Sequence, residues 1–336
     1  MRTPATAKVL VTGGAGYVGA HACKALAAAG YVPVVYDNLM RGHRRAVMWG
    51  PLEVGDVTDA GRLDETFRRH RPAAVMHFAA LSEIGSAWGD PHACFRNNVT
   101  GTLVLLERSI AHRVRTFVFS STCAVYGVPE RSPVGEDVPL APINPYGRSK
   151  MMAESALREA AAAHGMGVAA LRYFNAAGAS RGGEIGEDHE PETHLVPRVL
   201  LAARDPRRVL RIHGTDHPTR DGSAVRDYVH VEDLARAHVA ALERLSGDAL
   251  TGFHAINLGS GRGHSVLDVV SAAERITGRR IRTRRGPRRA GDPPRLIADT
   301  TKARTLLDWQ PECSDIDTLI ATAWAWTMRN ALAHAV

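Results

Sequence analysis

Short apolar runs alternate with amphipathic stretches through the first half of the chain. Runs rich in β-branched and other apolar residues are typical of buried strands, and apolar positions three or four residues apart are typical of helices. The runs predict strands at residues 8–11, 33–36, 74–78, 116–119 and 168–173. The stretches between them predict helices at residues 18–29, 60–70, 92–111 and 146–164. This alternation predicts an α/β fold with a doubly wound parallel sheet covered by helices on both faces.

The pattern loosens after Tyr173. Residues 175–188 are rich in glycine, and the following region is interrupted by Pro191, Pro197, Pro206 and Pro218. Such segments favour ligand-covering loops and short helices over regular sheet. A further helix is predicted at residues 231–245 and a further strand at residues 253–258. We therefore expect a larger domain of residues 1–175 plus about 226–258, and a smaller C-terminal α/β domain of about 176–225 and 259–336.

The composition is that of an ordinary globular protein. Of 336 residues, 45% are hydrophobic and 23% are charged, and the formal net charge is +7. Much of the excess charge lies in the arginine-rich run 279–289, which we interpret as a solvated surface with about one or two arginines that contact a polyphosphate. No nucleic-acid-binding module accompanies the charge, so no nucleic-acid partner is expected. No run approaches the ~20 apolar residues of a membrane span and no signal peptide is visible, which predicts a cytoplasmic protein without a membrane partner.

The four cysteines are widely separated along the chain. They form no CxxC pair and show no matching histidine spacing, so we expect reduced thiols and no metal site.

A glycine-rich turn lies between the first predicted strand and the first predicted helix. It reads Thr12-Gly-Gly-Ala-Gly-Tyr-Val-Gly19, with Gly13, Gly16 and Gly19 in a GxxGxxG spacing around Tyr17 and Val18. Glycine permits the tight turn and lets backbone N–H groups approach a pyrophosphate at the start of a helix. The context of strand, turn and helix predicts a Rossmann-type dinucleotide-binding domain.

Two acidic positions follow at the spacing that such a domain uses. Asp37-Asn38 ends the second predicted strand, where a carboxylate can accept hydrogen bonds from the adenosine ribose and repel a 2′-phosphate. This favours NAD over NADP. A helix cap or turn aspartate is the alternative interpretation of Asp37. Asp56-Val57, after a third strand-like run, suits the adenine edge, although a simple turn explains it nearly as well.

A tyrosine and a lysine four residues apart are the candidate catalytic pair. Residues i and i+4 share a helix face, so Lys150 can lie beside Tyr146 within Tyr146-Gly-Arg-Ser-Lys150. An ammonium there favours the phenolate and lowers the tyrosine pKa from about 10 toward the range of a general base. Together with the dinucleotide turn, this pair predicts reversible hydride chemistry at a carbinol carbon.

With these motifs in place, the chain resembles the extended short-chain dehydrogenase/reductase family and, within it, the 4-epimerases of UDP-glucose and UDP-galactose. The resemblance runs from Val9 to about Trp309. Beyond the glycine turn, the matching stretches begin at residues 36, 77, 97, 120, 144, 172, 225, 257 and 289: YDNL, HFAA, NNVTG, SSTCAVYG, NPYGRSK, RYFN, VRDYVH, NLGSG and RAGD.

The resemblance implies a role for each matching position. The larger domain would bind NAD and the smaller one the nucleotide sugar. Tyr146 would be the catalytic acid/base, Lys150 its partner, and Thr122 the residue that hydrogen-bonds the sugar hydroxyl. The NAD pocket would be lined by Phe78, Ala79, Ala80, Asn97 and Phe174. The nucleotide sugar would be held by Asn175, His194, Leu195, Arg226, Arg289 and Asp292, with the two arginines facing the diphosphate. A surface histidine at 194 and a salt bridge from Arg226 to Asp227 are the alternatives.

The resemblance also implies a mechanism and an assembly. Tyr146 would remove the proton of the sugar 4-hydroxyl while hydride passes from C4 to NAD⁺, and the 4-ketopyranose would turn over and take the hydride back on its opposite face. The helices around residues 92–111 and 147–164 would pair with those of a second subunit in a homodimer.

Three places depart from the family pattern. Leu296 replaces a tyrosine that narrows the sugar pocket, so N-acetylated sugars are expected to fit as well. His213 and His217 stand where aromatic residues contact the base, and Ser82-Glu83 stands where some members carry a lysine.

The alternatives are other enzymes and a sensor. A 4,6-dehydratase needs an acidic pair after the catalytic threonine, but Thr122 is followed by Cys123-Ala124. A 4-epimerase of a UDP-N-acetylhexosamine, UDP-glucuronate or a UDP-pentose stays open. A non-catalytic NAD-binding sensor is disfavoured, because it would not need Thr122, Tyr146 and Lys150 together.

Overall fold

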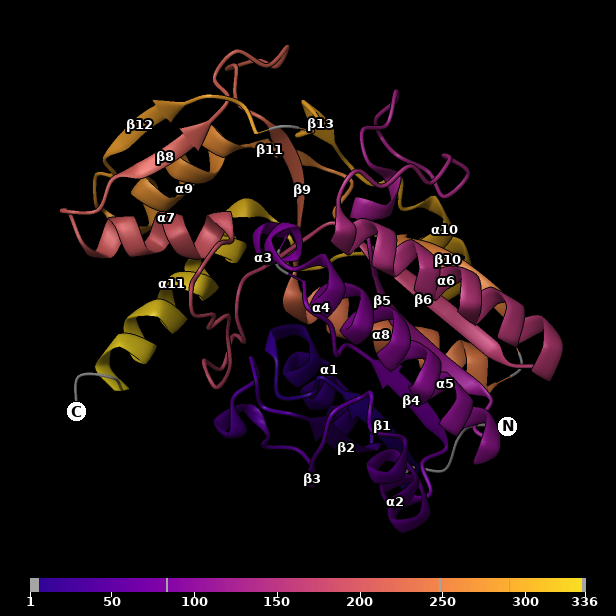
Figure 1. Ribbon diagram of the computed structural model, residues 1–336. Helices are drawn as coiled ribbons and strands as arrows, with labels where there is room; N and C mark the ends of the chain where they lie inside the picture. The colour runs from indigo at the N-terminus through magenta and orange to yellow at the C-terminus, as the bar shows by residue number, and fades with distance from the viewer. Residues whose placement is uncertain (1–5, 83, 248, 290, 334–336) are drawn as a thin grey trace.

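The computed structural model describes residues 6–82, 84–247, 249–289 and 291–333. Glu83, one of the departures noted above, lies outside them. The largest element is a parallel sheet of seven strands in the order β10-β6-β5-β4-β1-β2-β3 (Figure 1). Its strands are β1 Lys8–Thr12, β2 Val32–Asp37, β3 Leu52–Val54, β4 Ala74–His77, β5 Thr116–Thr122, β6 Gly167–Tyr173 and β10 Gly252–Leu258. The α/β fold and the doubly wound parallel sheet are confirmed.

Helices cover both faces of this sheet, and the strand residues alternate between two hydrophobic cores. Val9 and Val11 of β1 face one core, whereas Leu10 between them faces the other. Alternation between polar and apolar residues would suggest a half-buried strand, but here both faces are covered and Val9, Leu10 and Val11 are all apolar. One core contains α1 Tyr17–Ala28, α8 Val231–Ser246 and α10 Thr301–Leu307; the other contains α2 Ala60–His70, α5 Gly101–Ala111 and α6 Pro145–His164.

The predicted helix at residues 92–111 is continuous in space but not uniform. It consists of α4 Pro91–Phe95, a π-helical turn at Arg96–Thr100, and α5. Asp90 begins it by accepting the Ala93 N–H, and Pro91 occupies the first turn, where no backbone donor is lost. The π turn adds a residue to the helix and buries Asn98, which is 1% exposed. Hydropathy periodicity does not reveal such a turn.

The smaller part of the molecule stands beyond the carboxyl ends of the large sheet (Figure 1). Its four-stranded sheet is centred on β9 and comprises β7 Asn175–Ala177, β9 Val225–His230, β11 Gly263–Ser265 and β13 Arg295–Leu296. A second, parallel pair is formed by β8 Leu210–His213 and β12 Thr283–Gly286. A third core packs α7 Leu195–Arg204, α9 Val266–Thr277 and α11 Ile316–Ala333 together. The remaining helices are the short α3 Ile84–Gly89 and two 3-10 turns, Arg44–Ala46 and Cys123–Tyr126.

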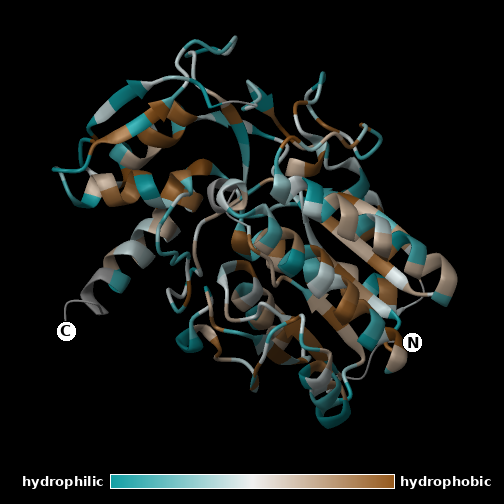
Figure 2. Ribbon diagram, viewed as in Figure 1, coloured by the Kyte–Doolittle hydropathy of each residue, from teal (hydrophilic) through white to brown (hydrophobic). Residues whose placement is uncertain are grey.

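Hydrophobic residues concentrate along the large sheet and the helix faces turned toward it, as Figure 2 shows. Within the described ranges, no helix combines the length and the apolar character that crossing a bilayer would require. The arginine-rich run contains β12, and its arginines are exposed. Arg288 pairs with Asp216, and the guanidinium of Arg279 lies 5.4 Å from the ring centroid of Trp324. The prediction that most of these arginines lie on the surface is confirmed.

Candidate active site

The glycine-rich turn joins β1 to α1 in a space that excludes larger side chains. Gly13 has a φ of +72°, and a Cβ added there would lie 2.5 Å from the Ala79 nitrogen. A Cβ at Gly19 would lie 2.2 Å from the Gly13 carbonyl oxygen. Both contacts are too close for any side chain, so the glycines let the turn pack directly on the end of β4. The free N–H groups at the start of α1 therefore face an open edge, where a pyrophosphate can bind.

Asp37 fixes the end of β2 against this turn. Its carboxylate accepts the Ala15 N–H at 3.0 Å and the Leu39 N–H at 2.8 Å, and the side chain is only 8% exposed overall. Burial raises the pKa of Asp37, although the two backbone hydrogen bonds oppose that rise. The interpretation of Asp37 as a turn aspartate is therefore correct for the chain itself. Its contact with a ribose stays a prediction.

Asn38 and Asp56 are brought together beside Asp37. The Asn38 Nδ2 donates to Asp56 Oδ2 at 2.8 Å, and Asp56 also accepts from the backbone and hydroxyl of Thr58. Partial burial opposes ionisation, but these hydrogen bonds outweigh it and hold the pKa of Asp56 below its usual value. Val57, next in the chain, is buried. The turn interpretation of Asp56-Val57 is again correct, and the adenine contact stays a prediction.

The loop after β4 is anchored by Asn98, which the sequence analysis did not single out. Its Oδ1 accepts the Leu81 N–H at 2.8 Å, and its Nδ2 donates to the Leu81 carbonyl at 3.0 Å and to Ser149 Oγ at 3.0 Å. Asn97 donates to the same Oδ1 at 2.9 Å. The bonds hold residues 78–81 beside the start of α6, so Phe78, Ala79 and Ala80 lie between the glycine turn and the candidate catalytic pair. The sequence did offer a signal for this anchor, because Asn98 is the second asparagine of the NNVTG stretch.

Thr122, Tyr146 and Lys150 come from two adjoining elements. Thr122 ends β5, and α6 begins at Pro145 after Asn144, whose side chain accepts the Gly147 N–H at 2.8 Å. A side-chain hydrogen bond joins Thr122 to Tyr146. One helical turn further on, the Lys150 Nζ donates to the Ser120 carbonyl at 2.9 Å and lies 4.7 Å from the Phe119 ring centroid. The structure therefore brings the three predicted catalytic residues to one edge of the sheet.

Burial affects the ionisation of both members of this pair. Burial raises the pKa of Tyr146, the neighbouring Tyr173 adds to the rise, and the hydrogen bond from Thr122 opposes it. Burial also lowers the pKa of Lys150 to about 7, while Cys94 and Glu154 raise it. In the chain by itself burial disfavours both charged forms, and the expectation that Lys150 brings the Tyr146 pKa down stays a prediction. A cationic group next to the phenol is still needed to favour the phenolate.

A buried polar network supports the site from below and was not predicted. Glu154 of α6 accepts from Arg172 Nε at 2.9 Å and from Ser121 Oγ at 2.5 Å. The Arg172 Nη1 donates to the Tyr126 hydroxyl at 3.0 Å, which donates to Asn257 Oδ1 at 2.6 Å. The network joins α6 to β5, β6 and β10 directly beneath Thr122. Its traces in the sequence were Arg172 of the RYFN stretch, Ser121 and Tyr126 of SSTCAVYG, and Asn257 of NLGSG.

Leu296 and Asn175 are two of the predicted sugar-binding residues, and they lie on β13 and β7 of the smaller sheet. Leu296 of β13 packs in one buried cluster with Cys123 and Phe174, which places it next to the catalytic threonine. Burial raises the pKa of the Cys123 thiol to about 12, so it remains a neutral packing residue. Asn175 begins β7, and its Oδ1 is buried without a hydrogen-bond partner among the described residues. An unsatisfied buried acceptor beside the candidate base is suited to a hydroxyl-bearing ligand.

Arg226 is oriented by Asp292, not by Asp227. Its Nη2 pairs with the Asp292 carboxylate, and its Nη1 donates to its neighbour's carbonyl at 2.7 Å. Asp227 points to the other side, where it is fully buried and accepts from Ser260, Gly261 and Ala298. The alternative interpretation of Arg226, a salt bridge to Asp227, is therefore wrong. Asp227 instead joins β9 to the NLGSG segment, a structural role that the sequence analysis missed.

Two of the predicted ligand-binding residues, His194 and Arg289, have exposed side chains. The His194 ring, directly before Leu195 and α7, is 47% exposed and pairs through Nδ1 with Glu187 at 2.6 Å. The Arg289 side chain is exposed. Burial lowers the pKa of the His213 imidazole, and the positive charge of the nearby Arg289 lowers it further. His217 is buried, and a Cβ at Gly214 would lie 2.4 Å from its Nε2. His217 thus packs inside its own loop.

Comparison with known proteins agrees with this geometry. The family profile described as "NAD dependent epimerase/dehydratase family" matches residues 9–259. The UDP-glucose 4-epimerase of Rhizobium meliloti (strain 1021) is 48% identical over 324 residues, covering 96% of this chain and 97% of that protein. The chain therefore belongs to the NAD-dependent epimerase/dehydratase family.

Structures of related enzymes have been solved with bound NAD. The UDP-glucose 4-epimerase of Brucella ovis, solved with NAD, is 50% identical with a TM-score of 0.92, covering 95% of this chain and 98% of that chain. The UDP-glucose 4-epimerase of Stenotrophomonas maltophila, solved with NAD and formylated UDP-arabinopyranose, is 36% identical with a TM-score of 0.93, covering 98% and 100%. Similarity on this scale extends over both parts of the molecule.

Proposed function

We propose that this protein catalyses the NAD-dependent 4-epimerisation of a UDP-hexose, interconverting UDP-galactose and UDP-glucose. The observation that carries the proposal is the convergence of Thr122, Tyr146 and Lys150 at the sheet edge that also bears the glycine turn. The near-full-length similarity to UDP-glucose 4-epimerases supports it.

The residues present fit NAD. The glycine turn at the start of α1 has no room for side chains at Gly13 and Gly19, and the Asp37 carboxylate lies beside it, accepting the Ala15 N–H; both features support an NAD site at this edge. When bound, NAD⁺ accepts hydride from the sugar C4 and returns it. We assign cofactor binding to Gly13, Gly16, Tyr17, Val18, Gly19, Asp37, Asn38, Asp56, Val57, Phe78, Ala79, Ala80, Asn97, Tyr146, Lys150 and Phe174.

Tyr146 is assigned the proton transfers. Its phenolate accepts the proton of the sugar 4-hydroxyl, and its phenol returns that proton to the 4-oxygen after the sugar has turned over. Thr122 orients the phenol and the 4-hydroxyl through its own hydroxyl. Lys150 supplies positive charge close to the Tyr146 oxygen, where it favours the phenolate electrostatically.

The nucleotide sugar is assigned to the smaller part of the molecule. Arg226, oriented by Asp292, offers a planar donor for the diphosphate, and Arg289 adds a second cation. The unpartnered Asn175 Oδ1 accepts a hydroxyl. We assign substrate binding to Thr122, Tyr146, Asn175, His194, Leu195, Arg226, Arg289, Asp292 and Leu296.

The assignment is tested by activity without added cofactor. We expect purified protein to convert UDP-galactose to UDP-glucose, because a closed pocket retains NAD through the cycle. Products are resolved by anion-exchange chromatography. Absence of conversion, even with NAD supplied, would transfer the function to another nucleotide sugar or to a non-catalytic NAD sensor, and parallel assays with UDP-N-acetylgalactosamine, UDP-glucuronate and a UDP-pentose distinguish these.

Leu296 is expected to set the range of sugars. Its side chain is 7% exposed and packs beside Cys123 and Phe174, so a larger residue there reduces the space near the sugar. Leu296→Tyr should lower kcat/KM for UDP-N-acetylgalactosamine at least about tenfold relative to UDP-galactose. Leu296→Met conserves volume and should preserve both rates. Equal losses for both substrates in the tyrosine variant would contradict a role in selectivity.

Lys150 is expected to set the pH at which Tyr146 ionises. Lys150→Met keeps the packing but removes the cation, so the phenolate becomes less stable and the Tyr146 pKa rises. We expect kcat to fall about 10²-fold and the limb of the kcat–pH profile that reports tyrosine ionisation to shift to higher pH. An unshifted limb with reduced kcat would assign Lys150 to positioning alone.

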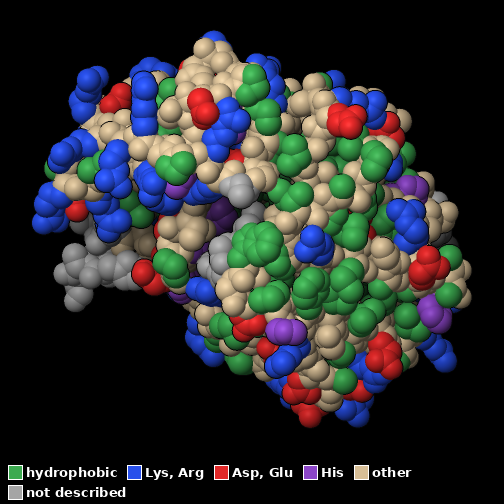
Figure 3. Space-filling model, turned by 45° about the horizontal axis from the view of Figure 1, so that its top comes forward, with side chains coloured by type: hydrophobic (Ala, Val, Ile, Leu, Met, Phe, Trp, Pro, Cys, Tyr) green, Lys and Arg blue, Asp and Glu red, His purple; other side chains and the backbone are tan. Residues whose placement is uncertain are grey.

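We also propose the domain division and the assembly. Residues 1–175 bind NAD together with a returning segment that starts at α8 rather than at residue 226, because β9 lies in the smaller sheet. About 176–230 and 259–336 bind the nucleotide sugar. A homodimer through α5 and α6 is supported by exposed apolar side chains on that face, including Leu103 and Met152, where Figure 3 shows hydrophobic side chains gathered.

A cytoplasmic location is supported by four buried, unpaired cysteines.

A further inference from the structure

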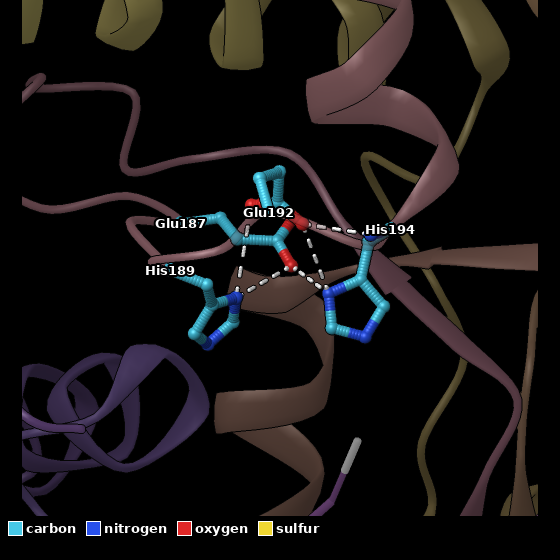
Figure 4. A group of neighbouring side chains, drawn as sticks. All are labelled: Glu187, His189, Glu192 and His194. Atoms are coloured by element: carbon cyan, nitrogen blue, oxygen red, sulfur yellow. Dashed lines mark hydrogen bonds and ion pairs between the residues drawn. The ribbon is translucent and has the colours of Figure 1, made fainter. Parts of the chain in front are cut away.

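Four side chains of types that bind metal ions lie together beside the candidate active site, and one of them, His194, is also assigned to substrate binding. Glu187, His189, Glu192 and His194 follow a Glu-x-His-x-x-Glu-x-His spacing in the loop before α7. One ligand atom from each lies within 4.8 Å of all the others. Figure 4 shows both carboxylates between the two imidazole rings, with Nδ1 of each ring turned toward them.

We propose that Glu187, His189, Glu192 and His194 bind one divalent transition-metal ion, and that zinc is the ion they suit. Imidazole nitrogen and carboxylate oxygen are common zinc ligands, and structural zinc sites have four protein ligands. Two carboxylates balance the charge of a divalent ion when both imidazoles are neutral. The sequence analysis expected no metal because it considered cysteine spacing, and this His/Glu pattern contains no cysteine.

The separations between these atoms approach those of a tetrahedral site. Metal–ligand bonds of about 2.0–2.1 Å place tetrahedral ligand atoms about 3.3 Å apart. The His189 Nδ1 lies 3.4 Å from Glu187 and 3.7 Å from Glu192, and the His194 Nδ1 lies 3.5 Å from Glu192. The 2.6 Å contact between His194 Nδ1 and Glu187 must lengthen, by about 0.7 Å, to admit an ion.

The local environment leaves one ligand atom unsatisfied. The His189 Nδ1 is buried and makes no hydrogen bond to the described part of the chain. The side chains of Glu187 and Glu192 are only 7% and 10% exposed. A buried imidazole nitrogen directed at two shielded carboxylates is satisfied by a shared cation.

An ion at this position must compete with protons. Burial lowers the pKa of both imidazoles, but the neighbouring Glu187 and Glu192 carboxylates outweigh it and raise the pKa of His189 to about 9 and that of His194 to about 10. Metal binding displaces these protons, so occupancy increases with pH.

The position indicates a structural role for the ion. The His189 ring meets the Tyr17 ring edge-on at 6.5 Å, at the start of α1. Asp188 pairs with Arg45 and His43, and Trp326 of α11 donates to the Glu187 carbonyl at 2.9 Å. An ion bound here would hold the loop of residues 187–194 over the glycine turn and define the start of α7. Its chemistry is independent of Tyr146.

Zinc titration of the full-length protein tests the site. NAD-bound, tag-free protein is treated with a chelator, and zinc chloride is then added in a calorimeter. We expect one ion per chain and a Tm increase of about 4 °C at 100 times the Kd. Cobalt added in place of zinc should give the visible absorption of a tetrahedral site.

Variants in the same loop assign the ligands. Glu187→Gln and His189→Gln should each weaken zinc binding about 100-fold, because even partners outside the ligand set are worth 10–100-fold. Glu190→Gln is the matched control, because the Glu190 side chain is exposed. The substitution leaves unchanged the Glu190 backbone carbonyl, which accepts a hydrogen bond from Arg41. The proposal is overturned if zinc does not bind stoichiometrically with a Kd below about 1 mM, or if wild type and both ligand variants bind zinc equally well. NAD content and circular dichroism verify that each variant is folded.

Discussion

Tyr146→Phe is expected to lower kcat for UDP-galactose by about 10³-fold or more while NAD stays bound. The substitution removes only the hydroxyl, and positioned general acid–base groups contribute about 10²–10⁴-fold to a rate. Phenylalanine retains the aromatic ring at the start of α6, so the ring of the variant should keep its place. Steady-state kinetics gives kcat, and the cofactor released on denaturation gives the NAD content.

Tyr173→Phe is the matched control for this prediction. Tyr173 lies close enough to raise the Tyr146 pKa, but its hydroxyl is engaged by Ser120. Removing that hydroxyl should therefore reduce kcat by less than about tenfold. A large loss at Tyr173 together with a small loss at Tyr146 would reverse the assignment of the base.

The second large effect is expected at the buried ion pair beneath the site. Glu154 and Arg172 are each 3% exposed, and Arg172→Met leaves the Glu154 carboxylate charged and without its partner. Breaking a buried pair by removing one partner costs about 3–5 kcal/mol. For a chain of this length the loss corresponds to a Tm decrease of about 5 °C, measured by calorimetry on NAD-loaded protein.

An exposed pair and a double variant serve as comparisons. Glu65, paired with Arg62 on α2, has a side chain that is 58% exposed, and Glu65→Gln should change the free energy of unfolding by less than about 1 kcal/mol. In Glu154→Leu/Arg172→Met no unpaired charge remains, so part of the lost stability should return. If the double variant is no more stable than Arg172→Met, the cost comes from packing and not from an uncompensated charge.

Local chemistry explains why so much of the larger domain could be predicted. The strands and helices around the glycine turn follow from short-range periodicity, and the elements observed at residues 8–12, 17–28, 60–70 and 231–246 differ from the predicted ones by one or two residues at most. Gly19 is required by a contact within one strand–turn–helix unit. Tyr146 and Lys150 share a helix, so their proximity is a property of spacing alone.

The π-helical turn shows where this reasoning ends. Apolar periodicity predicts one helix over residues 92–111, and the chain does remain helical there. The inserted residue that buries Asn98 depends on partners from elsewhere, namely Leu81 and Ser149. Helical propensity carries no information about such partners, so the anchor of the NAD-side loop was missed.

By itself, the sequence determined the class of fold, the glycine turn, the tyrosine–lysine pair and the family, because each depends on neighbours within a few residues or on motifs quoted in order. The tertiary structure alone decided which charges meet and how buried groups ionise. Arg226 pairs with a residue 66 positions away, Asp227 turns to a different loop, and burial raises the Tyr146 pKa. These outcomes depend on distances and desolvation across the whole molecule, which a linear pattern does not contain.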